Sequence, residues 1–97
     1  MSEITLIAAI TFTEPLDESL LGALAAVVAA TRQEPGCVEY NAHVHAEDAC
    51  RVLFYERWQD QAALDRHNAS AHLATWRAEA GSRLAGAPDL GFWKRLG

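Results

Sequence analysis

The sequence predicts an α+β fold of the ferredoxin-like type, with strands and helices in the order βαββαβ. An apolar, β-branched segment stands near the start of the chain, and an apolar stripe of helical period follows it. Two strand-like segments joined by a short polar loop then precede a second helical region. The 97 residues fit a single domain, residues 1–97. We expect a four-stranded antiparallel sheet with both helical regions on one face.

The first strand and the first helix are predicted from residues 3–33. Residues 3–13 are rich in β-branched and aromatic side chains, which favour a strand. Asp17 is suited to cap a helix over residues 18–33, which Pro35 and Gly36 end. The apolar stripe that should face the core comprises Leu20, Leu21, Leu24, Val27, Val28 and Thr31.

Residues 37–45 and 50–59 are predicted to form a hairpin around the polar loop 46–49. A loop of that length pairs His45 with Cys50 and Tyr40 with Tyr55. Alternation along the strands then places one polar and aromatic set on the same face: Cys37, Glu39, Asn41, His43, Val52, Phe54, Glu56 and Trp58. Such a mixture is typical of a small-molecule site. A slip of one residue in the register would re-sort all of these side chains.

The second helical region is predicted to be broken in two. Asp60 is suited to cap its first part, and residues 68–70 interrupt it. Ser70 can then cap a further helix over residues 71–84, and a last strand is expected around residues 90–96. The buried stripe of this helix comprises Leu73, Trp76, Ala80 and Leu84.

Composition excludes several classes of partner. The formal net charge is −5, and the eight Lys and Arg residues are scattered, whereas nucleic-acid binding needs a basic stripe. No apolar run reaches the roughly 18–20 residues of a membrane span, so we expect no membrane contact. Cys37 and Cys50 would lie at opposite ends of the hairpin, too far apart for a disulfide. Free thiols suit a reducing compartment, and we expect a cytoplasmic protein.

The sequence predicts neither a metal nor a nucleotide cofactor. His43 and His45 would share a strand face, but no third or fourth ligand stands at metal-binding spacing from them. No glycine-rich phosphate-binding motif occurs either. We therefore expect a protein that works without a bound cofactor.

An ordered set of residues in the middle of the chain resembles the antibiotic biosynthesis monooxygenase family. The set comprises Glu34, Pro35, Gly36, Cys37, Tyr40, Glu56, Trp58, Leu64, His67, His72 and Trp76. The resemblance implies a dimeric α+β barrel in which two copies pair through their sheet faces. It also implies oxidation of polycyclic phenols or quinols without metal or flavin. Residues 4–13 lack the first-strand asparagine of the haem-degrading members, which argues against haem degradation; Asn41 and Asn68 do not match its position.

The resemblance suggests catalytic roles for His72, His67 and Glu56. His72 would remove a proton from a bound phenol, because imidazole titrates near neutral pH, and Glu56 would orient the site. Structural roles stay open: the histidines as helix-end residues, and Glu56 as the partner of a histidine or an indole. The predicted substrate-binding residues are Tyr40, Asn41, His43, Phe54, Trp58 and Trp76, of which the tyrosine and the tryptophans could equally be core residues.

Three functions remain compatible with the sequence. The first is a cofactor-independent monooxygenase that acts on a small phenolic or quinol-type substrate. The second is an isomerase or another proton-transfer enzyme on the same scaffold. The third is a dimer that binds a small ligand without catalysis, since a fold does not fix a function.

Overall fold

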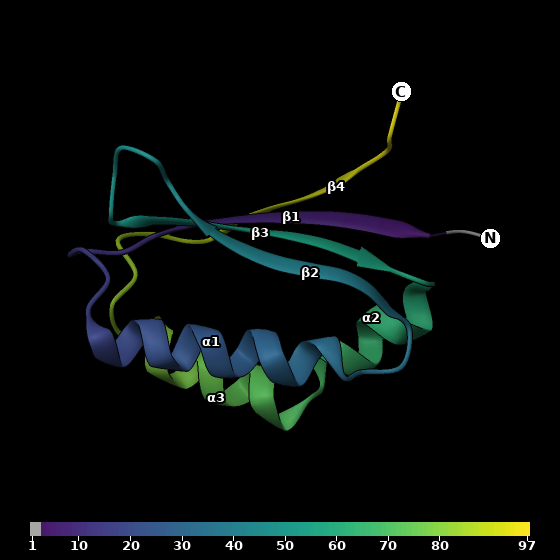
Figure 1. Cartoon of the computed structure of the whole chain (residues 1–97), viewed down its shortest axis with the longest axis horizontal. Helices are drawn as coiled ribbons and strands as arrows, with labels where there is room; N and C mark the ends of the chain where they lie inside the picture. The colour runs from purple at the N-terminus through teal and green to yellow at the C-terminus, as the bar shows by residue number, and fades with distance from the viewer. Residues whose placement is uncertain (1–2) are drawn as a thin grey trace.

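The computed structural model describes residues 3–97 and contains, within them, four strands and three helices. In chain order these are β1 (Ile4–Thr11), α1 (Glu18–Arg32), β2 (Cys37–Val44), β3 (Arg51–Trp58), α2 (Gln61–Asn68), α3 (Ala71–Gly81) and β4 (Asp89–Trp93). The strands form one antiparallel sheet in the order β2-β3-β1-β4. Figure 1 shows the helices in one layer beneath the sheet. The predicted ferredoxin-like fold is confirmed.

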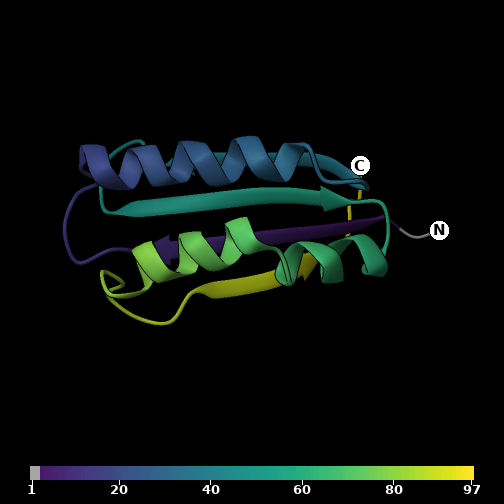
Figure 2. The same cartoon turned by 90° about the horizontal axis from the view of Figure 1, so that it is seen from below.

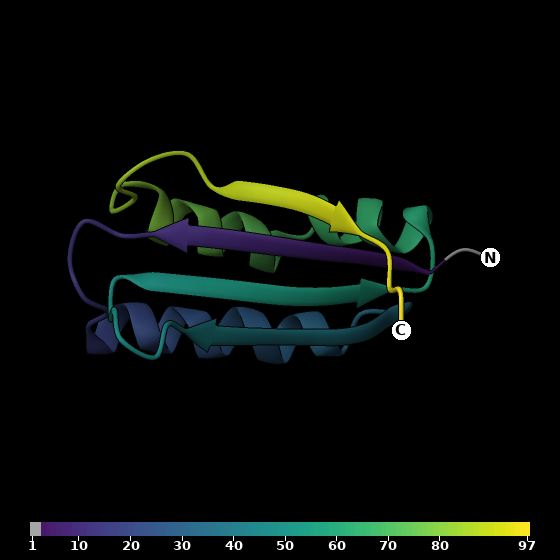
Figure 3. The same ribbon diagram turned by 90° about the horizontal axis from the view of Figure 1, so that it is seen from above.

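The two faces of the sheet differ in what covers them. Figure 2 views the layer of helices, with α1 beneath the β2–β3 half and α2 and α3 beneath the β1–β4 half. Figure 3 views the opposite face, where the four strands lie in front and, of the described residues, only the C-terminal segment after β4 crosses them. The sheet therefore has one face packed against helices and one open face.

Side-chain caps start the helices where the sequence predicted them. Asp17 accepts a hydrogen bond from the Leu20 amide at 2.9 Å, and Asp60 accepts one from the Ala63 amide at 2.9 Å. Ser70 Oγ accepts from the amide of Leu73 at 3.3 Å, which begins α3 directly after the break that ends α2. These bonds satisfy amides that have no partner within the first helical turn. The predicted division of the second helical region is confirmed.

Gly36 fixes the path of the chain between α1 and β2. Its φ of +85° lies in the left-handed region, which favours glycine. A Cβ at this position would also lie 2.5 Å from the Cβ of Ala63 on α2. The α1–β2 connection can therefore approach α2 closely only because residue 36 is glycine. This contact brings the neighbouring Glu34 near the end of α2.

The predicted hairpin register was wrong by one residue. The structure pairs Tyr40 with Glu56 and Asn41 with Tyr55, where the sequence predicted Tyr40 opposite Tyr55. The loop is longer than predicted, because Asp48 holds a turn by accepting from the Cys50 amide at 2.9 Å. Cys50 thus belongs to the turn and not to the strand, and His45 donates its amide to Arg51 at 2.8 Å.

This slip re-sorts the two faces of the hairpin. Tyr40 joins Phe54, Glu56 and Trp58 on the face that packs against the helices, and each of these four side chains is buried. Asn41 and His43 lie on the open face, opposite Tyr55 and Leu53. The prediction that placed Asn41 and His43 beside Glu56 is therefore wrong. Cys37 still pairs with Trp58, because a bulge between Cys37 and Glu39 shifts the register at that end.

The stripe of α1 confirms most of the predicted core. Leu20, Val27 and Thr31 are buried, whereas Leu21 is 51% exposed and does not belong to the buried face. α1 has 15 residues, and no helix within residues 3–97 is long and apolar enough to cross a membrane. The core that results lies between the helices and the inner face of the sheet, where Trp58 is the largest fully buried side chain.

Candidate active site

A cavity of about 320 Å³ lies between the inner face of the sheet and helices α2 and α3. This volume falls at the lower end of the range for small-molecule sites, roughly 300–1,000 Å³. Its walls are mainly apolar and include Leu6, Ala8, Ile10, Phe54, Leu73, Trp76, Ala80 and Leu84. Five polar side chains also line it, namely Tyr40, Glu56, His67, Asn68 and Arg77. The cavity can hold a flat apolar molecule and offer it a few hydrogen bonds.

Glu56 supplies a carboxyl group to the wall of the cavity. Its side chain is only 5% exposed, and burial raises its pKa from 4.5 to about 7. Trp58 opposes this shift, because its indole Nε1 donates a hydrogen bond to Glu56 Oε1 at 2.9 Å. The negative charge of Glu34 raises the pKa further. A carboxyl group with this pKa can exchange a proton with a bound molecule near neutral pH.

Tyr40 stands opposite Glu56 across the β2–β3 pair and remains a neutral phenol at ordinary pH. Burial and the charge of Glu56 together raise its pKa well above the usual range. Its ring is packed at centroid distances of 5.3 Å from His67 and 5.6 Å from Phe54. The side chain of Thr31 on α1 interacts with the phenol and partly opposes this rise in pKa, so Tyr40 contributes a fixed, neutral side chain to the cavity wall.

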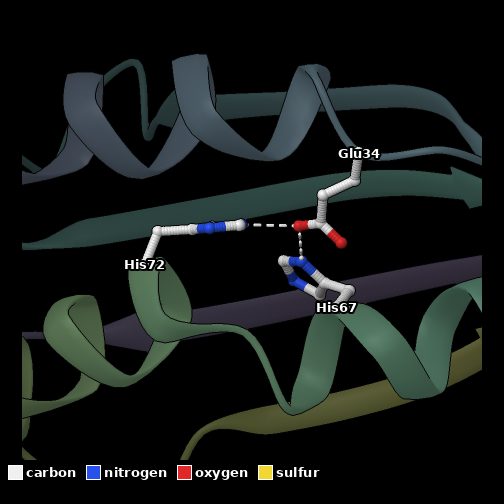
Figure 4. Close-up of side chains that lie close together, drawn as sticks. All are labelled: Glu34, His67 and His72. Atoms are coloured by element: carbon white, nitrogen blue, oxygen red, sulfur yellow. Dashed lines mark hydrogen bonds and ion pairs between the residues drawn. The ribbon is translucent and has the colours of Figure 1, made fainter.

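Glu34 holds two histidines with one oxygen atom. His67 Nδ1 donates to Glu34 Oε2 at 2.8 Å, and His72 Nε2 donates to the same oxygen at 2.6 Å (Figure 4). The three residues come from the α1–β2 connection, the end of α2 and the start of α3. Because Glu34 accepts both bonds, it fixes the tautomer and the ring orientation of each imidazole.

His67 is the buried member of this cluster, with 3% of the residue exposed. Burial lowers its pKa, and the hydrogen bond to Glu34 opposes that change. Its ring lies 4.6 Å from the Trp58 ring, centroid to centroid, with an interplanar angle of 33°. His67 thus connects the cavity to the Glu34 cluster behind it.

The structure brings some of the predicted site residues together and separates others. Tyr40, Phe54, Glu56, His67 and Trp76 all line the cavity. Trp58 lies behind Glu56 as its hydrogen-bond donor, and His72 lies behind His67 in the Glu34 cluster. Neither of these two residues lines the cavity.

Asn41 and His43 take no part in the cavity. The Asn41 side chain accepts a hydrogen bond from Arg32 at 2.8 Å and donates one to Glu39 at 2.8 Å. His43 is exposed on the open face of the sheet. Their predicted role as substrate-binding residues of this site depended on the wrong hairpin register.

Sequence reasoning did not assign a role to Glu34, Asn68 or Arg77. Glu34 carried one usable signal: an acidic residue directly after the C-terminal end of a helix is disfavoured by the helix dipole. Its presence there indicates a compensating partner, which the structure identifies as the two histidines. Asn68 and Arg77 carried no such signal, because exposed polar residues on a helix are common.

Comparison with known proteins identifies one family over most of the chain. The family model described as antibiotic biosynthesis monooxygenase matches residues 3–79. A Mycobacterium tuberculosis protein named "Putative monooxygenase Rv0793" is 38% identical over 66 residues. That alignment spans 68% of this chain and 64% of the relative, which is less than two thirds of the relative's length.

Solved structures of similar proteins cover nearly the whole chain. The structure of Rv0793 superimposes with a TM-score of 0.86 at 28% identity, covering 99% of this chain and 97% of that one. The structure of PA3566 from Pseudomonas aeruginosa gives a TM-score of 0.88 at 32% identity, covering 100% of this chain and 97% of that one. The fold and the sequence pattern point to the same group of proteins.

Proposed function

The chain belongs to the antibiotic biosynthesis monooxygenase family, as its sequence pattern predicted, and from this premise we propose that it oxidises a small phenolic or quinol-type substrate with dioxygen. In this proposal the reaction needs neither a metal nor a flavin. The observation that carries the proposal is the position of Glu56, a carboxyl group with a pKa of about 7 in the wall of an apolar cavity. Such a group is matched to the removal of a phenolic proton at neutral pH.

Substrate binding follows from the shape and composition of the cavity. The rings of Phe54 and Trp76 lie 5.8 Å apart at 70°, and Tyr40 stands beside Phe54. These rings offer faces and edges against which a flat aromatic molecule can pack. Glu56 can then hydrogen-bond an oxygen of the substrate, because its side chain lines the same cavity.

Proton removal is the chemical step that the protein supplies. Ionised Glu56 takes the phenolic proton, and the resulting phenolate is electron-rich enough to donate an electron to dioxygen. Oxidation of the phenol to a quinone supplies all the electrons that reduce dioxygen, so the reaction needs no other reductant. One oxygen atom is added to a ring carbon, the other leaves as water, and the substrate loses two hydrogen atoms to that water. The apolar wall limits access of bulk water to the intermediate.

The histidines act indirectly in this proposal. His67 lines the cavity beside Tyr40, and Glu34 holds its ring in place. His72, which the sequence suggested as the base, does not line the cavity and reaches the site only through Glu34. We therefore assign proton removal to Glu56 and a positioning role to His72.

Oxygen uptake with a panel of phenols and hydroquinones tests this function. We expect wild-type protein to consume dioxygen with at least one member of the panel and to form the quinone. Proton exchange at a substrate carbon in anaerobic buffer, without oxygen uptake, would replace the proposal with an isomerase. Ligand binding without either reaction would replace it with a binding protein.

We also propose that two copies pair through their open sheet faces. The open face carries Ile7, Leu53, Tyr55 and Trp93, and Trp93 is 61% exposed in the single chain. Pairing of this kind buries roughly 2,000 Å² or more in obligate dimers. Leu53→Glu places a charge in that surface and should produce a monomer in sedimentation at micromolar concentration. A wild-type protein that sediments as a monomer would contradict the proposal.

A further inference from the structure

We propose that Glu34, His67 and His72 form a binding site for one divalent transition-metal ion of the Zn²⁺ class. The carboxylate oxygen of Glu34 and the facing nitrogens of the two histidines all lie within 4.8 Å of one another (Figure 4). The sequence predicted no metal site, because His43 and His45 have no further ligand near them in the chain. The proposed site uses the other two histidines, which the fold joins to a carboxylate more than thirty residues away.

The geometry needs only small movements to accept an ion. Zn²⁺ binds His nitrogen and carboxylate oxygen at about 2.0–2.2 Å, so neighbouring ligand atoms in a tetrahedral site lie about 3.3–3.6 Å apart. The two hydrogen bonds to Glu34 are 2.8 and 2.6 Å long. Each histidine nitrogen must therefore move less than about 1 Å away from the Glu34 oxygen, and the two nitrogens already lie within 4.8 Å of each other.

The donor set selects the class of ion. Two imidazole nitrogens and one carboxylate oxygen suit zinc, iron and cobalt, whereas magnesium and calcium prefer ligand sets made of oxygen alone. The carboxylate neutralises one charge of the ion. Three protein ligands leave at least one coordination position for water. His72, with 26% of its side chain exposed, gives the ion a route from solvent.

The position of the site indicates a structural role for the ion. Among the three ligands only His67 lines the cavity, and its Nδ1 is turned to Glu34. An ion bound there would lie behind the His67 ring and would join the α1–β2 connection to both α2 and α3. Calorimetry measures the binding of the ion without turnover, so a failure of one proposal does not decide the other.

Metal titration of the purified, chelator-treated chain tests the site directly. We expect one Zn²⁺ per chain by calorimetry, and Co²⁺ should show the visible absorption of a site with nitrogen and oxygen ligands. His72→Asn should weaken Zn²⁺ binding by more than about 100-fold, since even partners outside the ligand set contribute 10–100-fold. Glu34→Gln should weaken it similarly. The double variant His43→Asn, His45→Asn should bind as the wild type does.

Thermal unfolding provides a second readout that does not depend on activity. Zn²⁺ in excess should raise the Tm of the wild type and of the His43→Asn, His45→Asn control, because an ion that binds only the native state stabilises it. It should leave the Tm of His72→Asn unchanged; circular dichroism verifies that this variant is folded. Binding below one equivalent, or equal affinity in the wild type and His72→Asn, would overturn the proposal. Loss of binding in the control variant would do the same.

Discussion

Two acidic residues in the interior of this protein, Glu56 and Glu34, have opposite environments. Glu56 lies in the wall of an apolar cavity and accepts one hydrogen bond, from Trp58, so burial dominates and its pKa rises to about 7. Glu34 does not line the cavity and accepts hydrogen bonds from two imidazoles, those of His67 and His72. The comparison shows that the number of hydrogen-bond donors around a carboxylate influences its role. Glu56, with one donor, is suited to exchange a proton, whereas Glu34, with two, is suited to hold other side chains in place.

Of the changes proposed at the two acidic residues, removal of the carboxyl group of Glu56 should have the largest effect, a loss of turnover. Glu56→Gln keeps the size of the side chain and removes the base. Turnover of a phenolic substrate should fall on the order of 10²–10⁴-fold, the usual contribution of general base catalysis. Steady-state kinetics measures the loss, and Glu79→Gln, at an exposed position of α3, is the matched control. Wild-type turnover in Glu56→Gln would remove Glu56 from the mechanism.

The same variant should be more stable than the wild type at high pH. The folded-state pKa of Glu56, about 7, lies above its ordinary value of 4.5. The native state therefore holds this proton more tightly, and rising pH destabilises it between about pH 4.5 and pH 7. Glu56→Gln should gain at most about 3 kcal/mol relative to the wild type from pH 4 to pH 8. Urea unfolding at both pH values measures this difference, and a constant difference would contradict it.

Truncating Glu34 should instead destabilise the protein. Glu34→Ala leaves His67 Nδ1 without its acceptor inside the core, and His72 loses its partner as well. We expect a loss of about 2 kcal/mol in the free energy of unfolding, the usual cost of an unsatisfied buried donor. Glu79→Ala, at an exposed position of α3, should lose less than about 1 kcal/mol. Equal losses in the two variants would contradict the interpretation.

The smallest effect is expected from two substitutions next to Glu56, which should shift its pKa in opposite directions. Trp58→Phe removes the hydrogen bond that lowers the pKa of Glu56, so the rise of activity with pH should shift to higher pH. Glu34→Gln removes a charge that raises this pKa, so the rise should shift to lower pH. At pH 9 the turnover of Trp58→Phe should stay within about tenfold of the wild type. A rise of one unit in the pKa of Glu56 lowers its ionised fraction by no more than about tenfold at any pH. Profiles of kcat/KM against pH measure both shifts.

Local patterns in the sequence predicted the helices and strands well, because short-range interactions along the chain determine where these elements begin and end. Asp17, Asp60 and Ser70 each cap the helix that the sequence assigned to them. The break before α3 and the α1 stripe follow from the same short-range rules of capping and period. The hairpin register was predicted wrongly because Asp48 holds a longer turn, and one residue of slip sends Asn41 and His43 to the other face.

The sequence by itself determined the order of the elements, their caps, the family and five of the residues that line the cavity, namely Tyr40, Phe54, Glu56, His67 and Trp76. These features depend on the spacing of residue types along a short stretch of chain. Only the tertiary structure decided that Glu34 meets His67 and His72, and that His72 stays outside the cavity. The close approach at Gly36 and the packing of α2 set those contacts, and no local period encodes the meeting of side chains more than thirty residues apart.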